Sequence, residues 1–257
     1  MAFLTDAHCH LTDPQYGKIS TQLGAFIQAN QILIVCVSMD IQTSIATLSQ
    51  ARQMKDKVIP FVGIHPWTAS TLSAAQSLQH LERLAPDSGG LGETGLDRKY
   101  AQTNDQYEAQ RLVFASTLKL AEKLEKPISV HSRGSQDDVI SALSSYRLKA
   151  VNLHWFSGTV EQLRKAVQIG CFFSFGPTVV YSKKSQELLR NTPKDLLLTE
   201  TDGPVSYGAC FRNRMALPSF LPSVLFSLSS QLKMTFYDVI TLVEENFRRY
   251  LSLKAIY

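Results

Sequence analysis

The sequence of 257 residues predicts a single (β/α)8 TIM barrel that forms one domain over residues 1–257. Two observations favour this fold. Short runs rich in apolar and β-branched residues recur along the chain, and longer stretches with a helical pattern separate most of them. Several short runs are apolar almost throughout, which is typical of parallel strands covered on both faces. An open doubly wound sheet is the alternative, but it usually has fewer strands.

Eight segments are predicted as strands. They are residues 3–8, 32–38, 58–64, 90–93, 127–131, 149–154, 171–175 and 195–200. The fourth has weak strand propensity because it is rich in glycine. Its assignment therefore depends on its place in the series and on the motif that it carries.

Most of the intervals between these strands have helical periodicity. The clearest is 104–124, where apolar residues recur at roughly helical spacing until Lys126 and Pro127 end the helix and begin the next strand. The longest irregular segment, 203–222, follows the eighth strand. Further helices are predicted at 18–29, 41–53, 71–85, 135–146, 159–169, 182–191 and 235–253.

The composition, with 44% hydrophobic and 19% charged residues, is that of a soluble globular protein. No apolar run is long enough to cross a membrane, and the N-terminus lacks the pattern of a secretory signal. The four cysteines lack the spacing of a metal site or a disulfide framework, so we expect a cytoplasmic protein with no membrane contact. The net charge of +4 permits a phosphate-rich ligand without requiring one.

Five of the six histidines lie in short motifs at the ends of predicted strands, and two motifs with carboxylates share that placement. Active sites of (β/α)8 barrels gather at the carboxyl ends of the strands, so these side chains are expected to meet there. The histidine motifs are residues 6–10, 63–67, 129–133 and 152–155, and the carboxylate motifs are residues 92–97 and 199–204.

The side chains in these motifs have the chemistry of a metal centre. His8 and His10 are two residues apart, so a strand directs both to the same face. Each candidate alone has a structural explanation, such as a core histidine, a salt-bridged glutamate or a turn aspartate, but their shared placement favours a site. The candidate ligands are His8, His10, Glu93, His131, His154 and Asp202.

The type and number of these candidates indicate which metal they suit. Nitrogen and oxygen ligands without a thiolate suit Zn²⁺, Mn²⁺ or Mg²⁺. Six ligands are more than one tetrahedral ion needs, and they suit a pair of ions bridged by a carboxylate. We therefore expect two divalent metal ions as cofactors.

The same motifs resemble those of the TatD family of metal-dependent deoxyribonucleases, in the amidohydrolase-type barrel superfamily. They occur in family order and extend over essentially the whole chain. The resemblance implies cleavage of phosphodiester bonds in DNA, single-stranded DNA above all, by a metal-activated hydroxide and with 3′–5′ exonuclease polarity. It also implies that one ion is held by His8, His10, Glu93 and Asp202, and the other by Glu93, His131 and His154.

Further roles follow from this hypothesis. Glu93 and Asp202 are the catalytic candidates, and Asp202 would accept or orient the proton of the water. His65 and Arg133 are the candidates to contact substrate phosphate. The alternatives are a hydrogen bond that stabilises a loop for His65 and a surface ion pair for Arg133.

Two other sets of residues have the chemistry of a nucleic-acid contact. Aromatic residues near the predicted strand ends could stack on a base, although core or loop packing explains at least two of them. Basic residues after the seventh and eighth strands could add positive potential, although a solvated basic face is a common alternative. The aromatic residues are Trp67, Trp155, Phe156 and Tyr207, and the basic residues are Lys183, Lys184, Arg212 and Arg214.

The chain departs from the family pattern around the substrate. Trp155 stands where a small or sulfur residue is usual, Arg98 where an aromatic is common, and Gly134 where an acidic residue is common. The usual basic run ending in Asn-Glu-Pro after the eighth strand is not recognisable. Such departures are typical of a specialised member of the family. The TatD-like subunit of the bacterial Qat anti-phage defence system is one candidate for that member.

Two other functions stay open. The same ions can polarise a carbonyl, so a metal-dependent amidase, esterase or deacylase is one alternative. Glu93 stands where that superfamily often has a carboxylated lysine, which favours the nuclease. The other alternative is a subunit of a defence complex that retains the metal pocket and acts by binding a protein partner. Trp155 and the altered segment 203–222 motivate that hypothesis.

Overall fold

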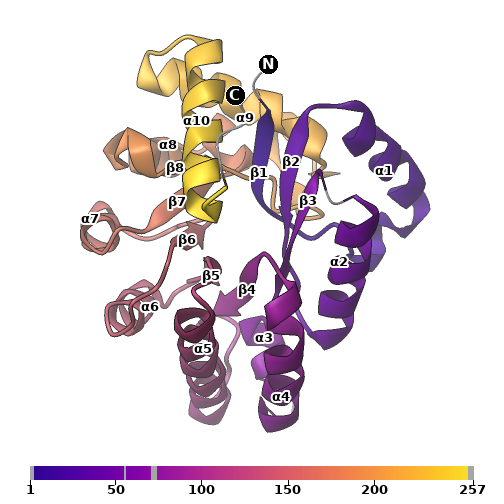
Figure 1. Cartoon of the computed structure of the whole chain (residues 1–257). Helices are drawn as coiled ribbons and strands as arrows, with labels where there is room; N and C mark the ends of the chain where they lie inside the picture. Colours follow the sequence, from indigo (N-terminus) through magenta and orange to yellow (C-terminus); the bar gives the residue numbers. More distant parts are fainter. Residues whose placement is uncertain (1–2, 55, 71–73, 254–257) are drawn as a thin grey trace.

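The computed structural model describes residues 3–54, 56–70 and 74–253. Eight parallel strands follow one another in sequence order, and helices surround them (Figure 1). The predicted (β/α)8 barrel is therefore confirmed. The strands are β1 Leu4–Cys9, β2 Ile32–Cys36, β3 Val58–Val62, β4 Gly90–Gly95, β5 Ile128–His131, β6 Val151–His154, β7 Phe172–Phe175 and β8 Leu197–Thr199.

Ten α-helices lie within the described residues, and none of them is long and apolar enough to cross a bilayer. Eight of them fall on the predicted helical segments; residues 71–73 of one predicted segment lie outside the described residues. The helices are α1 Ser20–Ala29, α2 Ile41–Gln53, α3 Pro66–Ala69, α4 Ala74–Leu84, α5 Asn104–Leu124, α6 Gln136–Leu143, α7 Val160–Gln168, α8 Lys183–Asn191, α9 Leu221–Leu232 and α10 Phe236–Leu251.

Several helices begin at a side chain that satisfies the first free backbone amides. In α2, α5 and α7 the capping side chain accepts a hydrogen bond from the amide three residues later. The side chain at that later position accepts a bond from the amide of the cap in return. Each such cap stabilises its helix by about 1 kcal/mol. The caps are Asp40, Thr103 and Thr159.

The sequence does not predict α9, and it predicts the segment before it as irregular. Serine, which favours helix ends and turns, recurs in α9. The helix forms because its buried face, which includes Val224, Leu225 and Leu228, packs in the core. Before it, β9 Ser206–Tyr207 and β10 Arg214–Met215 form an antiparallel ribbon. Short 3-10 helices are η1 Pro14–Ile19, η2 Ala85–Asp87, η3 Pro177–Val180, η4 Lys194–Leu196, η5 Ala209–Phe211 and η6 Pro218–Phe220.

Aromatic side chains from β3, β7 and α10 fill the amino end of the barrel. The ring of Tyr250 lies 6.1 Å from that of Phe61 and 5.6 Å from that of Phe172, between centroids. Its hydroxyl donates to the carbonyl of Ile128 at 2.9 Å. Ile128 and Phe172 begin their strands, so this packing lies opposite the carboxyl ends, where the histidine motifs lie.

β1 and β8 lie beside each other, and hydrogen bonds from side chains and from the chain after β8 join them. Thr199 Oγ1 donates to the carbonyl of Thr5 at 2.6 Å. Beyond the end of β8, the amide of Asp202 donates to the carbonyl of His8 at 2.9 Å. These bonds bring Asp202, from the far end of the barrel sequence, next to the histidines of β1.

Glycine explains why β4 forms in spite of its weak propensity. Gly95 has φ 138°, and a Cβ there would collide with the carbonyl oxygen of His131. Only glycine adopts this conformation at low cost and lets β4 approach β5 so closely. The glycines of β4 therefore place Glu93 beside the end of β5.

Candidate metal centre

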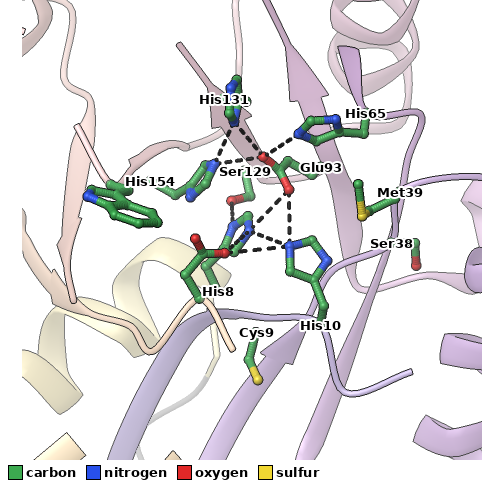
Figure 2. A network of polar contacts seen from close by, with 12 residues as sticks. His8, Cys9, His10, Ser38, Met39, His65, Glu93, Ser129, His131 and His154 are labelled. Atoms are coloured by element: carbon green, nitrogen blue, oxygen red, sulfur yellow. Dashed lines mark hydrogen bonds and ion pairs between the residues drawn. The ribbon is translucent and has the colours of Figure 1, made fainter. Parts of the chain in front are cut away.

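The carboxylate of Glu93 lies at the centre of a histidine cluster at the carboxyl end of the barrel (Figure 2). Its Oε2 lies 3.3 Å from His8 Nε2 and 3.2 Å from His10 Nε2. Asp202 Oδ1 lies 3.6 Å from each of the same two nitrogens. These four residues, from the ends of β1, β4 and β8, converge as the ligands of one metal ion would.

The other oxygen of Glu93, Oε1, faces a second group of imidazoles. It lies 2.7 Å from His154 Nε2, 2.9 Å from His131 Nδ1 and 3.1 Å from His65 Nε2. The ring of His8 stacks on that of His154 with centroids 3.7 Å apart, so the two groups are in contact. Glu93 therefore directs one oxygen to each group, which is the arrangement of a carboxylate that bridges two ions.

Hydrogen bonds indicate which ring nitrogens are free to bind a cation. His8 Nδ1 lies 2.8 Å from Ser129 Oγ, and the tautomer that donates this bond directs the Nε2 lone pair at the cluster. His131 Nε2 lies 3.1 Å from Asp97 Oδ2, which leaves Nδ1 to face Glu93. Metal-binding histidines usually have such a partner, because it holds the ring in place and raises its basicity.

His65 has the opposite tautomer to the one described for His8. Its Nδ1 accepts a hydrogen bond from the amide of Trp67 at 3.1 Å, so its proton is on Nε2, which faces Glu93. In this tautomer His65 donates to Glu93 and has no lone pair for a metal. Burial lowers the pKa of His65, which keeps the ring neutral. The geometry makes His65 a support for Glu93, and its predicted contact with substrate phosphate stays a prediction.

The charges in the cluster compensate one another. Burial favours the neutral form of Glu93, but the surrounding imidazoles outweigh it and hold the pKa of this carboxyl well below its usual range. Burial also opposes a charge on His10, yet hydrogen bonds to Asp202 and Glu93 prevail and raise its pKa to about 10. Burial opposes a charge on His131 as well, but Asp97 and Glu93 raise its pKa to about 9.

Metal binding at pH 7.5 is expected to release about one proton from each of His10 and His131. We expect both rings to be protonated in the metal-free protein at this pH, because their carboxylate partners raise the pKa values to about 10 and about 9. A metal ligand must give up the proton on its binding nitrogen. Calorimetric titration in buffers of different ionisation enthalpy measures the number released. A release close to zero would contradict the assignment.

The donor set fits a divalent metal ion. The described part of the chain contains three groups of residues that could hold a metal ion. Within each group, the ligand atoms lie within 4.8 Å of one another. All six predicted ligands belong to these groups, so the structure brings them together. Cys9 points away from the cluster (Figure 2), and its Sγ lies 3.7 Å from the carbonyl of Gly203. The groups are His8–His10–Glu93, His8–His154–Asp202 and His65–Glu93–His131.

Asp97 supports the second group of imidazoles. It is fully buried and accepts hydrogen bonds from Trp67 Nε1 at 2.8 Å and from the amide of Lys99 at 2.9 Å. Burial favours its neutral form, but hydrogen bonds to His131 and Trp67 prevail and lower its pKa to about 2. Asp97 is therefore an anion, and hydrogen bonds from backbone amides hold its carboxylate in place.

Asp97→Asn is expected to weaken metal binding at the second group by about 10- to 100-fold, because a neutral amide cannot increase the basicity of His131. Titration of the metal-free protein with Mn²⁺ or Zn²⁺ measures the two binding steps. The group around His8 and His10 is the internal control, and its affinity is expected to stay unchanged. Equal affinity of variant and parent in both steps would contradict the supporting role.

Glu200, a buried carboxylate behind the cluster, is not among the site residues predicted from the sequence. It accepts hydrogen bonds from the amide of Trp155 at 2.9 Å and from the hydroxyl of Ser174 at 2.5 Å. Its Oε2 lies 3.9 Å from His154 Nδ1. Burial and the charge of Asp202 raise the pKa of Glu200 well above its usual range. A signal was present, because Glu200 stands two residues before Asp202 in the same motif.

The cluster opens into a cavity of about 630 Å³ that Trp67, Trp155 and Arg133 also line. Trp67 is 36% exposed. The ring of Trp155 lies 5.4 Å from the ring of Tyr207, which is buried. Phe156 is buried too, and packs in the core. Of the four aromatic residues predicted to stack on a base, only Trp67 and Trp155 are therefore placed to do so.

A family model described as TatD related DNase matches residues 5–252. The chain belongs to this family. YabD of Bacillus subtilis (strain 168), an uncharacterized metal-dependent hydrolase, is 28% identical over an alignment of 253 residues that covers 96% of this chain and 98% of YabD. Human deoxyribonuclease TATDN3 is 29% identical over an alignment of 215 residues that covers 78% of each chain. The crystal structure of YjjV, a TatD homologue from Escherichia coli K12, has a TM-score of 0.87 at 23% identity and covers 96% of this chain and 97% of its own.

These similarities confirm the predicted resemblance and the predicted class, a TatD-type metal-dependent hydrolase. The likeness to YjjV shows that the TatD fold is shared. The protein partners and the role in defence stay predictions.

Proposed function

We propose that this protein is a two-metal deoxyribonuclease that hydrolyses phosphodiester bonds of single-stranded DNA. The observation that carries the proposal is the placement of Glu93, whose two oxygens each face a separate group of histidines. The family and the deoxyribonuclease relative support DNA as the substrate. An open cavity of about 630 Å³ beside the cluster supports a polymeric substrate that enters from one side.

Each of the two groups would hold one ion, and both would share Glu93. Mg²⁺, Mn²⁺ or Zn²⁺ suits these nitrogen and oxygen donors. Ions of this kind supply positive charge to phosphoryl oxygens and lower the pKa of water. The first group is His8, His10, Asp202 and Glu93, and the second is His131, His154 and Glu93.

Asp202 is the residue best placed to accept a proton during hydrolysis. Burial favours its neutral form, but hydrogen bonding to His10 and the nearby imidazoles lower the pKa of this carboxyl, so Asp202 is an anion that can take a proton. It lines the cavity, where a substrate phosphate would lie. Arg133 lines the same cavity with a side chain that is 57% exposed, and its planar guanidinium suits a phosphate.

Trp155→Ala is expected to raise KM for single-stranded DNA roughly 5- to 150-fold with little change in kcat, because stacking contributes about 1–3 kcal/mol per base. Trp155→Phe retains an aromatic face and is expected to restore most of the affinity. Steady-state kinetics with an intact oligonucleotide and with one that lacks a base at the terminal position separate stacking from packing. A loss of equal size on both substrates would contradict stacking.

The first test of the proposed function is hydrolysis of a 5′-labelled single-stranded oligodeoxynucleotide by metal-stripped protein with Mg²⁺, Mn²⁺ or Zn²⁺ added back. We expect a ladder of labelled products that are shortened from the 3′ end and that form only when metal is present. Panels of esters and amides, assayed in parallel, test the hydrolase alternative. Cleavage of these panels without cleavage of DNA would overturn the proposed substrate. No turnover on any panel with metal bound would favour a partner-binding subunit.

A further inference from the structure

A second cavity, of about 450 Å³, lies beside the β9–β10 ribbon, outside the metal centre. Phe211 and Phe220 line it, and their rings stack with centroids 4.8 Å apart and an interplanar angle of 19°. Arg212 and Arg214 line it as well. An apolar aromatic surface and two cations therefore border the same space.

No described residue supplies a counter-charge to the two arginines. Both are exposed, and neither guanidinium group has an ion pair or a hydrogen bond to any described residue. Other arginines of this protein are engaged, such as Arg248 with Glu244 at 2.7 Å. Two like charges that line one cavity repel each other, and an anion between them would relieve that repulsion. The cavity is therefore suited to a negatively charged ligand.

A row of aromatic rings leads from this cavity to the metal centre. The ring of Phe211 lies 6.3 Å from that of Tyr207, and the ring of Tyr207 lies 5.4 Å from that of Trp155. Trp155 lines the metal cavity and directly follows the candidate ligand His154. Aromatic residues therefore connect the metal cavity with the second cavity.

The β9–β10 ribbon also brings the two cavities close together. Ser206 lines the metal cavity, and Arg214 lines the second one. In the ribbon, Met215 pairs with Ser206 and Arg214 pairs with Tyr207. Ser206 and Arg214 thus belong to adjacent residue pairs of the ribbon, and the two strands of a ribbon lie about 5 Å apart. A chain molecule that leaves the metal cavity past Ser206 meets Arg214 within a short distance.

We propose that the second cavity binds the sugar–phosphate backbone of the same single strand whose scissile phosphate lies at the metal centre. This inference rests on the proposed nuclease function and deepens it, since it predicts that the substrate is a strand of several nucleotides. Arg212 and Arg214 bind phosphates of the strand as charge-assisted donors. The phosphates, rather than the bases, are recognised here, so binding is independent of sequence.

The test compares a thymidine dinucleotide with a thymidine decamer as substrates of the Arg212→Gln/Arg214→Gln double variant. We expect KM for the decamer to rise about tenfold with kcat unchanged, a loss of about 1.4 kcal/mol. KM for the dinucleotide is expected to stay the same, because it is too short to reach the second cavity. The matched control is Lys119→Gln/Lys123→Gln, which removes the same charge from the exposed face of α5.

Equilibrium binding gives a second readout that does not require cleavage. Anisotropy of a fluorescent thymidine decamer is measured against salt in the Asp202→Asn background, with and without the two arginine substitutions. Removing two phosphate contacts is expected to reduce the slope of log K against log salt by about 1.4. The lysine control is expected to leave the slope unchanged.

The outcomes separate this inference from the proposed function. If the decamer is cleaved and the arginine and lysine variants have equal KM values and equal salt slopes, the second binding site is refuted while the nuclease stands. If no DNA is cleaved but binding depends on the arginines, the nuclease is refuted and the strand-binding site stands. If the protein neither cleaves nor binds DNA, both are refuted.

Discussion

Glu93→Gln is expected to lower the rate of hydrolysis at least about a thousandfold, because the charge that both groups of histidines share is lost. Each oxygen of Glu93 lies within 3.3 Å of an imidazole nitrogen of its own group, so the substitution would affect both of the proposed ions. An amide nitrogen cannot bind a metal, and metal ions supply several kcal/mol of transition-state stabilisation. Hydrolysis of labelled DNA and the metal content of the dialysed protein measure the two effects together.

The fold is expected to survive this substitution, because glutamine has nearly the same volume as glutamate and leaves the hydrophobic core of the barrel unchanged. Circular dichroism and thermal unfolding check this directly. Glu245→Gln is the matched control: Glu245 is exposed on α10, and its substitution is expected to change neither activity nor metal content. Full activity of Glu93→Gln, or of the Glu93→Ala variant beside it, would overturn the two-ion scheme.

Asp202→Asn is expected to lower kcat by about a hundred- to ten-thousandfold while KM changes little, because asparagine cannot accept a proton. The amide oxygen keeps the position that now lies 3.6 Å from His8 and His10, so the protein is expected to retain metal. Single-turnover hydrolysis, together with the metal content, separates loss of proton transfer from loss of metal. The control is Asp105→Asn, at an exposed position in the first turn of α5.

The same variant distinguishes the nuclease from a partner-binding subunit. A loss of hydrolysis with full metal content supports the role of Asp202 in proton transfer. A loss of metal in proportion to the loss of activity would assign Asp202 to metal binding alone. Tight binding of a protein partner that Asp202→Asn leaves unchanged, together with no turnover by the parent protein, would instead favour the binding subunit.

The barrel and the general location of the site could be predicted from the sequence. Periodicity distinguishes strands from helices, because a strand repeats every two residues and a helix every 3.6. Parallel strands all direct their carboxyl ends to the same side of the barrel. Glu93, His131 and His154 lie at the ends of different predicted strands. Their proximity in the structure could therefore be predicted from strand direction alone.

Helix α9 and the β9–β10 ribbon could not be predicted in the same way. The serines of α9 lower its helix propensity, and only burial of its apolar face against the core stabilises it. The ribbon consists of two short strands whose pairing depends on the packing around them. Arg212 and Arg214 therefore appeared in the sequence only as basic residues after a strand, and the cavity that they line became visible in the structure.

The sequence by itself determined the fold class, the family and the six candidate ligands, because these depend on periodicity, order and residue type. Only the tertiary structure showed that each oxygen of Glu93 faces a separate group of imidazoles. It also showed that Nδ1 of His65 accepts a hydrogen bond from the backbone, so that the proton on its Nε2 faces Glu93. It also decided that Glu200 lies behind the cluster. The reason is physical: side-chain rotamers and the contact between β1 and β8 determine these distances, and neither follows from spacing along the chain.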